Sequence, residues 1–225
     1  MCLTREHLSD VDAKRLAGHR AALLNAAKWD VGSAITIRFL EGASELQERV
    51  KKVAKEWTAR GLANLTLDFR NSGPTDIRIA FRQGSGSWSY LGTMCRQIPE
   101  PQPTMNYGWL KPGSSDDVLR RVVLHEFGHA LGLIHEHQNP RGGIKWNEAA
   151  VVRDLSGPPN NWDLAKIKHN MFKKYESGEV TATVVDPDSI MMYPIPKAWT
   201  LDGFSADLNS ALSPQDKSLI MAAYP

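Results

Sequence analysis

The first half of the chain alternates between two hydrophobic periodicities, one typical of strands and the other of helices. Residues 34–40 are rich in β-branched side chains and partly alternate between apolar and polar positions, which predicts a strand. Residues 44–60 place apolar side chains at i, i+3, i+4 and i+7, which predicts an amphipathic helix that ends at Gly61. Residues 65–69 and 77–81 predict two further strands.

Two more segments, residues 87–92 and 104–110, have a strand pattern, and a proline-rich loop separates them. Either segment can form the edge of a sheet above a cleft, and the sequence leaves this choice open. Together the elements predict an α+β fold with a twisted, mixed five-stranded sheet backed by two helices.

A third helix is predicted after the turn at residues 111–113. Ser114 or Ser115 can cap its first turn, where the helix dipole favours the negative charge of Asp116 and Asp117. Hydrophobic residues at helical spacing can form its buried face: Leu119, Val122, Val123, Phe127 and Ala130.

The remaining pattern is less regular. Residues 139–143 and 157–160 predict loops, whereas residues 162–175 and 214–224 predict helices, the second of which closes the chain. Residues 5–29 also predict a helix, with leucines among alanines and charged side chains.

Composition narrows the class of protein. The chain has 225 residues, 42% hydrophobic and 23% charged, which is ordinary for a globular protein with a sizeable core. A net charge of +2 without a dense basic run argues against nucleic acid or an anionic membrane as a partner. No apolar stretch approaches the about 20 residues that span a bilayer.

One histidine-rich stretch is the most informative pattern. His125 and His129 stand at i and i+4, so on a helix both imidazoles project from one face. Gly132 can end that helix in a left-handed turn, which brings His135 back as a third ligand. Three protein ligands leave one zinc position open, the arrangement of catalytic sites. Glu126 lies where its carboxylate can reach a water at the metal. The alternative is an amphipathic helix whose histidines are solvated or satisfied in the core.

The pattern His-Glu-x-x-His-x-x-Gly-x-x-His resembles the zinc motif of the metzincin peptidases, which also carry a downstream methionine turn. Residues 189–193, Ser-Ile-Met-Met-Tyr, look like that turn. With the His-Glu-His sequence at 135–137, they look most like the astacin family. The resemblance covers roughly Trp29 to the C-terminus and implies the metzincin fold.

The resemblance also implies roles for individual residues. One catalytic zinc ion is held by His125, His129 and His135, and Glu126 acts as general base. Met191 supports the histidines as an apolar floor, with an ordinary core methionine as the alternative. Tyr193 is implied as a fifth zinc ligand at rest that moves to stabilise the transition state, with a buried structural tyrosine as the alternative.

The function implied is that of a zinc-dependent metalloendopeptidase, in which a zinc-bound water attacks the peptide bond. Its partner is a protein or peptide substrate, and we expect a monomer. One alternative is a latent or inactive metzincin scaffold that serves as a peptide-binding module, against which the intact Glu126 argues. Another is a narrowly selective, toxin-like effector protease.

The resemblance to the astacin family also divides the chain into two parts. Residues 1–30 are expected to be an N-terminal helical extension or a pro-segment remnant. Residues 31–225 are expected to form the catalytic domain, with an upper lobe at 31–132 and a lower lobe at 133–225 on either side of the cleft.

Cysteine use and the N-terminus bear on export. Secreted astacin-like enzymes commonly carry two disulfides, but this chain has only Cys2 and Cys95, and Ser87 replaces a family cysteine. A Cys2–Cys95 bridge is one option, a Cys2 thiolate that blocks the zinc is another, and an incidental cysteine is a third. Residues 1–30 lack a signal-peptide pattern. We expect a protein that is secreted or otherwise delivered outside the producing cell.

Several residues near the motifs have competing interpretations. Glu136 matches the astacin residue that receives the new N-terminus after activation, with a local hydrogen-bonding role as the alternative. His137 is expected to lie next to the ligands or in solvent, and His169 in solvent. Lys197 either favours acidic side chains after the cleaved bond or is an ordinary exposed lysine.

Overall fold

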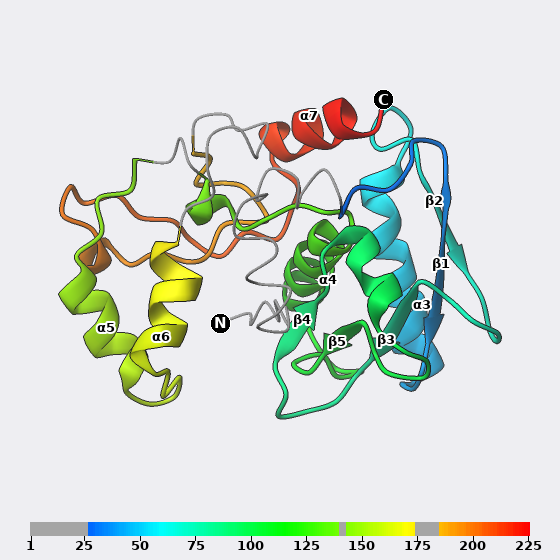
Figure 1. The fold of residues 1–225 in the computed structure, drawn as a ribbon, viewed down its shortest axis with the longest axis horizontal. Helices are drawn as coiled ribbons and strands as arrows, with labels where there is room; N and C mark the ends of the chain where they lie inside the picture. Colours follow the sequence, from blue (N-terminus) through cyan, green and yellow to red (C-terminus); the bar gives the residue numbers. More distant parts are fainter. Residues whose placement is uncertain (1–26, 140–142, 174–184) are drawn as a thin grey trace.

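The computed structural model describes residues 27–139, 143–173 and 185–225 of the chain. A sheet with its helices occupies one side of the molecule, and a second group of helices occupies the other (Figure 1). The helix predicted over residues 5–29 falls almost entirely outside the described residues, and so does Cys2. The division at residue 30 and the two lobes therefore stay predictions.

The sheet has five strands in the order β2-β1-β3-β5-β4. Strand β1 (Ala34–Phe39) pairs in parallel with β2 (Thr66–Phe69) and β3 (Ile77–Ala80), and β3 pairs in parallel with β5 (Met105–Tyr107). Strand β4 (Ser87–Ser89) runs antiparallel to β5 at the edge. The mixed five-stranded sheet is confirmed. Of the two segments that could form the sheet edge, residues 87–92 contain the edge strand β4, whereas residues 104–110 contain the inner strand β5.

Among the described residues, the predicted helix that begins at Ser44 and the predicted helix that carries His125 and His129 both pack into one hydrophobic cluster with this sheet. Helix α3 (Ser44–Ala54) begins at the predicted residue, but its end tightens into a 3-10 turn, η1 (Lys55–Thr58). Helix α4 (Asp116–Ala130) contacts α3, β4 and β5. Within η1, the buried Trp57 donates its indole N–H to Leu124 O of α4 over 3.0 Å, which fixes α4 against the rest of the layer.

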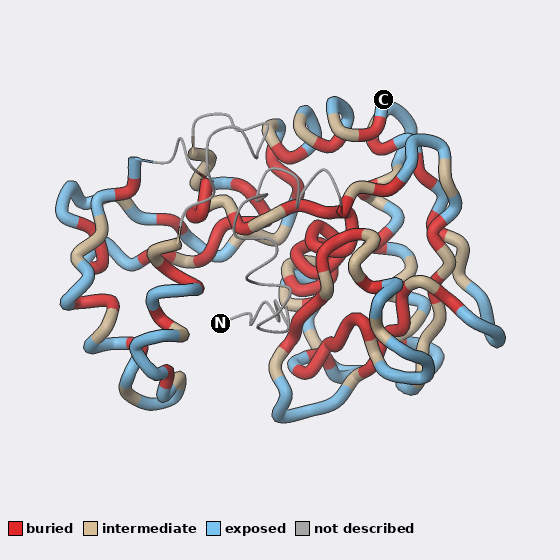
Figure 2. The backbone as a smooth tube through the Cα atoms, in the orientation of Figure 1, coloured by how far each residue is buried: buried red, intermediate tan, exposed pale blue. Residues whose placement is uncertain are grey.

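Buried hydrophobic side chains form two clusters. The larger lies between the sheet, α3 and α4, and includes every residue predicted for the buried face of α4. Figure 2 shows that buried segments concentrate around α4. The smaller cluster joins the second group of helices to the segment that follows the methionine turn. The predicted buried face of α4 is confirmed.

The second group consists of short elements. They are α5 (Glu148–Ser156), α6 (Leu164–Ile167), a π-helical turn η4 (Lys168–Phe172) and a 3-10 turn η5 (Lys197–Trp199). Helix α5 was not predicted. Its sequence signal was the N-cap Asn147, whose side chain accepts a hydrogen bond from Ala150 N at 3.3 Å.

The closing helix α7 (Pro214–Ala223) matches the prediction and packs on the larger cluster. Its C-cap residue Tyr224 donates its hydroxyl to Leu131 O over 2.7 Å, just past the end of α4. Asn64 N donates to Tyr224 O over 2.9 Å. The last residues of the chain therefore brace both α4 and the entry to β2.

Two short 3-10 turns complete the described elements, η2 (Gly92–Gln97) and η3 (Glu136–Gln138). Cys95 in η2 is a buried thiol, and burial raises its thiol pKa to about 12. Its possible partner Cys2 lies outside the described residues, so the bridge stays a prediction. Among the described residues, no helix is long and apolar enough to cross a membrane.

Candidate metal centre

Helix α4 presents the first two histidines. Of the two candidate capping serines, Ser115 is the N-cap, and its side chain accepts a hydrogen bond from Val118 N. His125 and His129 lie on the last turns of α4, and both are buried, with exposed fractions of 6% and 0%. Their i, i+4 spacing places both rings on one face of the helix, as expected.

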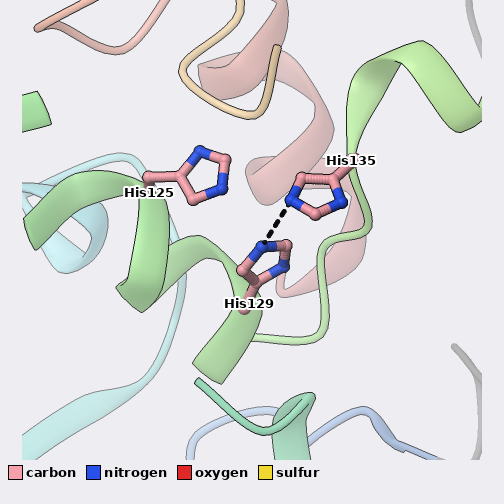
Figure 3. Close-up of side chains that lie close together, drawn as sticks. All are labelled: His125, His129 and His135. Carbon is pink, nitrogen blue, oxygen red and sulfur yellow. Dashed lines mark hydrogen bonds between the residues drawn. The ribbon is translucent and has the colours of Figure 1, made fainter. Parts of the chain in front are cut away.

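Gly132 turns the chain back. Its φ of +92° is in the left-handed region that glycine adopts at little cost. Gly132 N donates to His129 O over 2.8 Å, and Leu133 N donates to Gly128 O over 2.9 Å, which together form a Schellman motif at the end of α4. The return places His135 opposite the helix, and Figure 3 shows the three imidazoles converging.

The three rings offer nitrogens to one point. Ligand atoms of His125, His129 and His135 all lie within 4.8 Å of one another. The Nε2 atoms of His129 and His135 are 3.2 Å apart (Figure 3). Within the described part of the chain, the buried Nε2 of His125 has no hydrogen-bond partner, although a buried polar atom normally has one.

Backbone carbonyls orient two of these rings from behind. His125 Nδ1 lies 2.8 Å from Ile190 O, and His129 Nδ1 lies 2.8 Å from Leu133 O. A carbonyl oxygen only accepts hydrogen bonds, so we assign the ring proton to Nδ1, which leaves the lone pair on Nε2. This is the ligating tautomer, held by the backbone contacts that metal-binding histidines typically make.

Burial also keeps the imidazoles of His125 and His135 neutral. It lowers the pKa of His125 to about 4 and the pKa of His135 well below its usual value. A neutral ring is the form that binds a metal ion. The protonation state, the tautomer and the convergence of three nitrogens all fit a single zinc ion.

Met191 of the predicted methionine turn lies directly against α4. A Cβ atom placed on Gly128 would lie 2.3 Å from Met191 Sδ, so only glycine leaves room for the thioether. Gly128 stands between the two helical histidines. The structure thus places Met191 next to the turn that carries the ligands, where an apolar support was expected.

A residue that the sequence analysis missed anchors the methionine turn. Asp216 of α7 accepts hydrogen bonds from Ser189 Oγ at 2.6 Å and from Ile190 N at 2.8 Å. Ile190 in turn orients His125 through its carbonyl oxygen. The available signal was Ser213-x-x-Asp216, which forms the capping box of α7, but that signal predicts only a helix start.

Tyr193 lies among the histidines. Its ring centroid is 4.3 Å from that of His135 and 6.3 Å from that of His125, and the residue is 2% exposed. The structure therefore brings it to the ligand cluster. His137, for which solvent exposure was one of two expectations, is buried with 1% exposure and lies next to the ligands.

The acidic residues differ in their surroundings. Glu126 follows the first histidine on α4 and is fully buried. Glu136 accepts hydrogen bonds from Asn139 Nδ2 at 3.0 Å and Asp186 N at 3.3 Å, while burial raises its pKa to about 7. These contacts favour the local hydrogen-bonding role for Glu136, and the role of receiving an N-terminus stays a prediction.

Two other candidates lie at the surface. His169 and Lys197 are both exposed. Lys197 belongs to η5, which packs against α5 in the second group of helices. A role for Lys197 in substrate selection stays a prediction.

Comparison with family models gives one match, to Astacin, a peptidase family, over residues 24–201. Among curated proteins, the zinc metalloproteinase nas-38 of Caenorhabditis elegans is 27% identical over 114 residues. That match covers 50% of this chain and only 14% of the nematode protein, so it reflects one part of a longer protein.

Solved structures match over nearly the whole chain. A structure of myroilysin is 42% identical, covers 90% of this chain and 98% of its own, and has a TM-score of 0.87. A second myroilysin structure is 41% identical with a TM-score of 0.67, and covers 89% and 86% of the two chains. High choriolytic enzyme 1 from Oryzias latipes, 14% identical with a TM-score of 0.53 over 88% and 95% of the two chains, shows the fold alone.

Proposed function

The chain belongs to the astacin family of zinc metallopeptidases, and from this premise we propose how its own residues hydrolyse peptide bonds. His125, His129 and His135 hold one zinc ion, and Glu126 is the general base. The observation that carries the proposal is the convergence of three buried imidazoles whose ligand atoms lie within 4.8 Å of one another. Zinc, when bound there, supplies a Lewis acid that polarises the scissile carbonyl and makes water nucleophilic at neutral pH.

Glu126 moves the proton. It follows His125 directly, so its carboxylate starts from the same turn of α4 as the first ligand. It takes a proton from the attacking water as the new C–O bond forms, and then gives that proton to the nitrogen of the leaving amine as the C–N bond of the peptide breaks. Complete burial excludes bulk water from this carboxylate and strengthens its electrostatic interaction with the reacting atoms.

Tyr193 is proposed as a fifth ligand at rest and as a hydrogen-bond donor to the carbonyl oxygen in the transition state. The position of its ring, 4.3 Å from that of His135, supports this role. Met191 is proposed to support the ligands without contacting substrate, through its packing on Gly128.

Strand β4 is proposed to bind the substrate backbone. Among the described strands it pairs only with β5, so it forms the edge of the sheet on that side. An extended peptide added along β4 would continue the sheet, and main-chain hydrogen bonds would hold it regardless of its side chains.

Two wider proposals follow from the family. Astacin-like proteases are generally secreted, and we propose that this protein also acts outside the producing cell. All three proposed zinc ligands come from one chain, so the site needs no second copy, and we propose a monomer.

The test is digestion of an unstructured protein such as casein by the wild type and by Glu126→Gln, with zinc measured on both. We expect cleavage by the wild type only, with about one zinc per chain in each protein. Wild-type protein without zinc would overturn the proposal. Zinc without turnover would instead favour the peptide-binding module, and cleavage of one folded target but not of casein would favour the selective effector.

A further inference from the structure

His137 is a buried aromatic residue outside the proposed ligand set, yet it contacts that set. Its ring lies 4.6 Å from the ring of Tyr193 at an interplanar angle of 24°, which is a stacked arrangement. It also lies 5.3 Å from the ring of His135 at 28°. Tyr193 therefore contacts an imidazole that is proposed to bind zinc and a second imidazole that is not.

A fixed contact holds the His137 ring. Its Nε2 lies 2.7 Å from Asn170 O in the π-helical turn η4. That carbonyl can only accept, so Nε2 carries the proton and donates it. Asn170 lies near the end of η4, where carbonyls have no partner within the helix, and His137 supplies one.

The neighbouring residues make this attachment rigid. Gln138, next to His137, donates its side-chain N–H to His169 O over 3.2 Å, so η3 is joined to η4 at two consecutive carbonyls. Trp146 meets the His137 ring edge-on, with centroids 6.3 Å apart at 88°. The His137 ring is thus held by an edge contact and a hydrogen bond while one face remains against Tyr193.

We propose that His137 is a positioning residue for Tyr193, whose ring it holds at the zinc site through face-to-face stacking. The inference rests on the role proposed above for Tyr193. In its proposed role, the Tyr193 hydroxyl has to reach the metal at rest and the negative charge on the carbonyl oxygen in the transition state. A stacking surface that limits the orientations of its ring favours both positions, because small misplacements of a catalytic group reduce the rate strongly.

Two substitutions separate stacking from the hydrogen bond. His137→Leu removes both, whereas His137→Phe keeps an aromatic face but leaves Asn170 O without its donor. Both should lower the melting temperature, because a buried carbonyl loses its partner. Only His137→Leu should lower kcat markedly, by about tenfold, while KM and zinc content change little.

A spectroscopic readout reports on the tyrosine itself. A phenolate bound to Cu(II) adds a visible charge-transfer band, so the copper-substituted protein should show such a band and Tyr193→Phe should remove it. We expect a weakened or shifted band in His137→Leu and a band close to wild type in His137→Phe. Leu155→Ala is the matched control. Leu155 lies in α5, which contacts α6 and η5, and its truncation opens the smaller hydrophobic cluster, to which Tyr193 also belongs. It should lower stability and leave the band in place.

The outcomes are distinguishable. An unchanged band and an unchanged kcat in His137→Leu would overturn the positioning role and leave the proposed function standing. An equal change of the band in Leu155→Ala would also overturn it, because any loss of core packing would then suffice. A wild type without a Tyr193-dependent band would overturn both the inference and the role of Tyr193. A wild type that neither binds zinc nor cleaves casein marks the failure of the proposed function itself.

Discussion

The thioether of Met191 packs on Gly128, between the two histidines of α4, so closely that a Cβ atom on Gly128 would lie 2.3 Å from Met191 Sδ. The same Cβ would lie 3.3 Å from Trp57, so the thioether and the indole both limit the space at this position. This contact joins two motifs that are far apart in the sequence. It explains why a helix that must hold two ligands carries glycine, a poor helix former, in its last turns.

Gly128→Ala should therefore weaken the site. Alanine gains about 1 kcal/mol of helix propensity, but overpacking costs typically about 1–3 kcal/mol, so a net loss of stability is expected. Zinc affinity should fall more clearly than stability, because the clash displaces the turn between His125 and His129. Thermal unfolding and zinc titration measure the two effects. Gly113→Ala is the control, since its Cβ would meet no atom within 4 Å; equal effects of both substitutions would refute the explanation.

Asp216→Asn should lower zinc affinity, although Asp216 lies on α7, which carries none of the proposed ligands. The carboxylate accepts from Ser189 Oγ, Ile190 N and Ser213 N, and an amide group cannot accept at both of its ends. Loss of the bond to Ile190 frees the carbonyl that orients His125. Substitutions of such outer contacts typically reduce metal affinity by about 10–100-fold.

Competition with a chromophoric chelator measures this affinity, with the exposed Asp207→Asn as control. A lower melting temperature with unchanged zinc affinity would restrict Asp216 to capping α7.

The zinc-free protein should lose stability in mild acid. Burial lowers the pKa of His125 and of His137 to about 4, whereas a histidine in an unfolded chain titrates near about 6.5. Between these values the unfolded state binds more protons than the native state, so stability is fully present above about pH 6.5 and decreases as the pH falls toward about 4.

Unfolding of chelator-treated protein at pH 7, 6 and 5 tests this dependence. A flat profile over that range would contradict it.

Zinc removal should destabilise the protein reversibly. A ligand present at 100 times its dissociation constant stabilises the native state by about 2.7 kcal/mol, which for a chain of this size corresponds to a melting-temperature shift on the order of 5–10 °C. Zinc should restore the shift after chelation. Magnesium should not, because it prefers oxygen ligands and the site offers imidazole nitrogens. Equal recovery with both ions would contradict a histidine site.

Local sequence patterns predicted most of the sheet and the helices that pack with it. Strand β1 could be predicted because its β-branched, partly alternating residues favour a strand. Helix α4 could be predicted because a capping serine and two first-turn aspartates mark its start and a glycine marks its end. Helix α5 was not predicted, because it has too few buried residues to establish a helical period: Ala150, Val151 and Leu155. Its packing partners, α6 and η5, come later in the chain.

The sequence alone determined the ligand geometry of His125 and His129, because i, i+4 spacing on a helix is a local property, and the return of His135, because Gly132 can adopt a positive φ. Only the tertiary structure decided which strand forms the sheet edge, that His137 is buried against Tyr193, and that Asp216 holds the methionine turn. These relationships depend on which distant segments meet when the hydrophobic clusters close, and hydrophobic burial is non-directional, so the local pattern does not specify its partners.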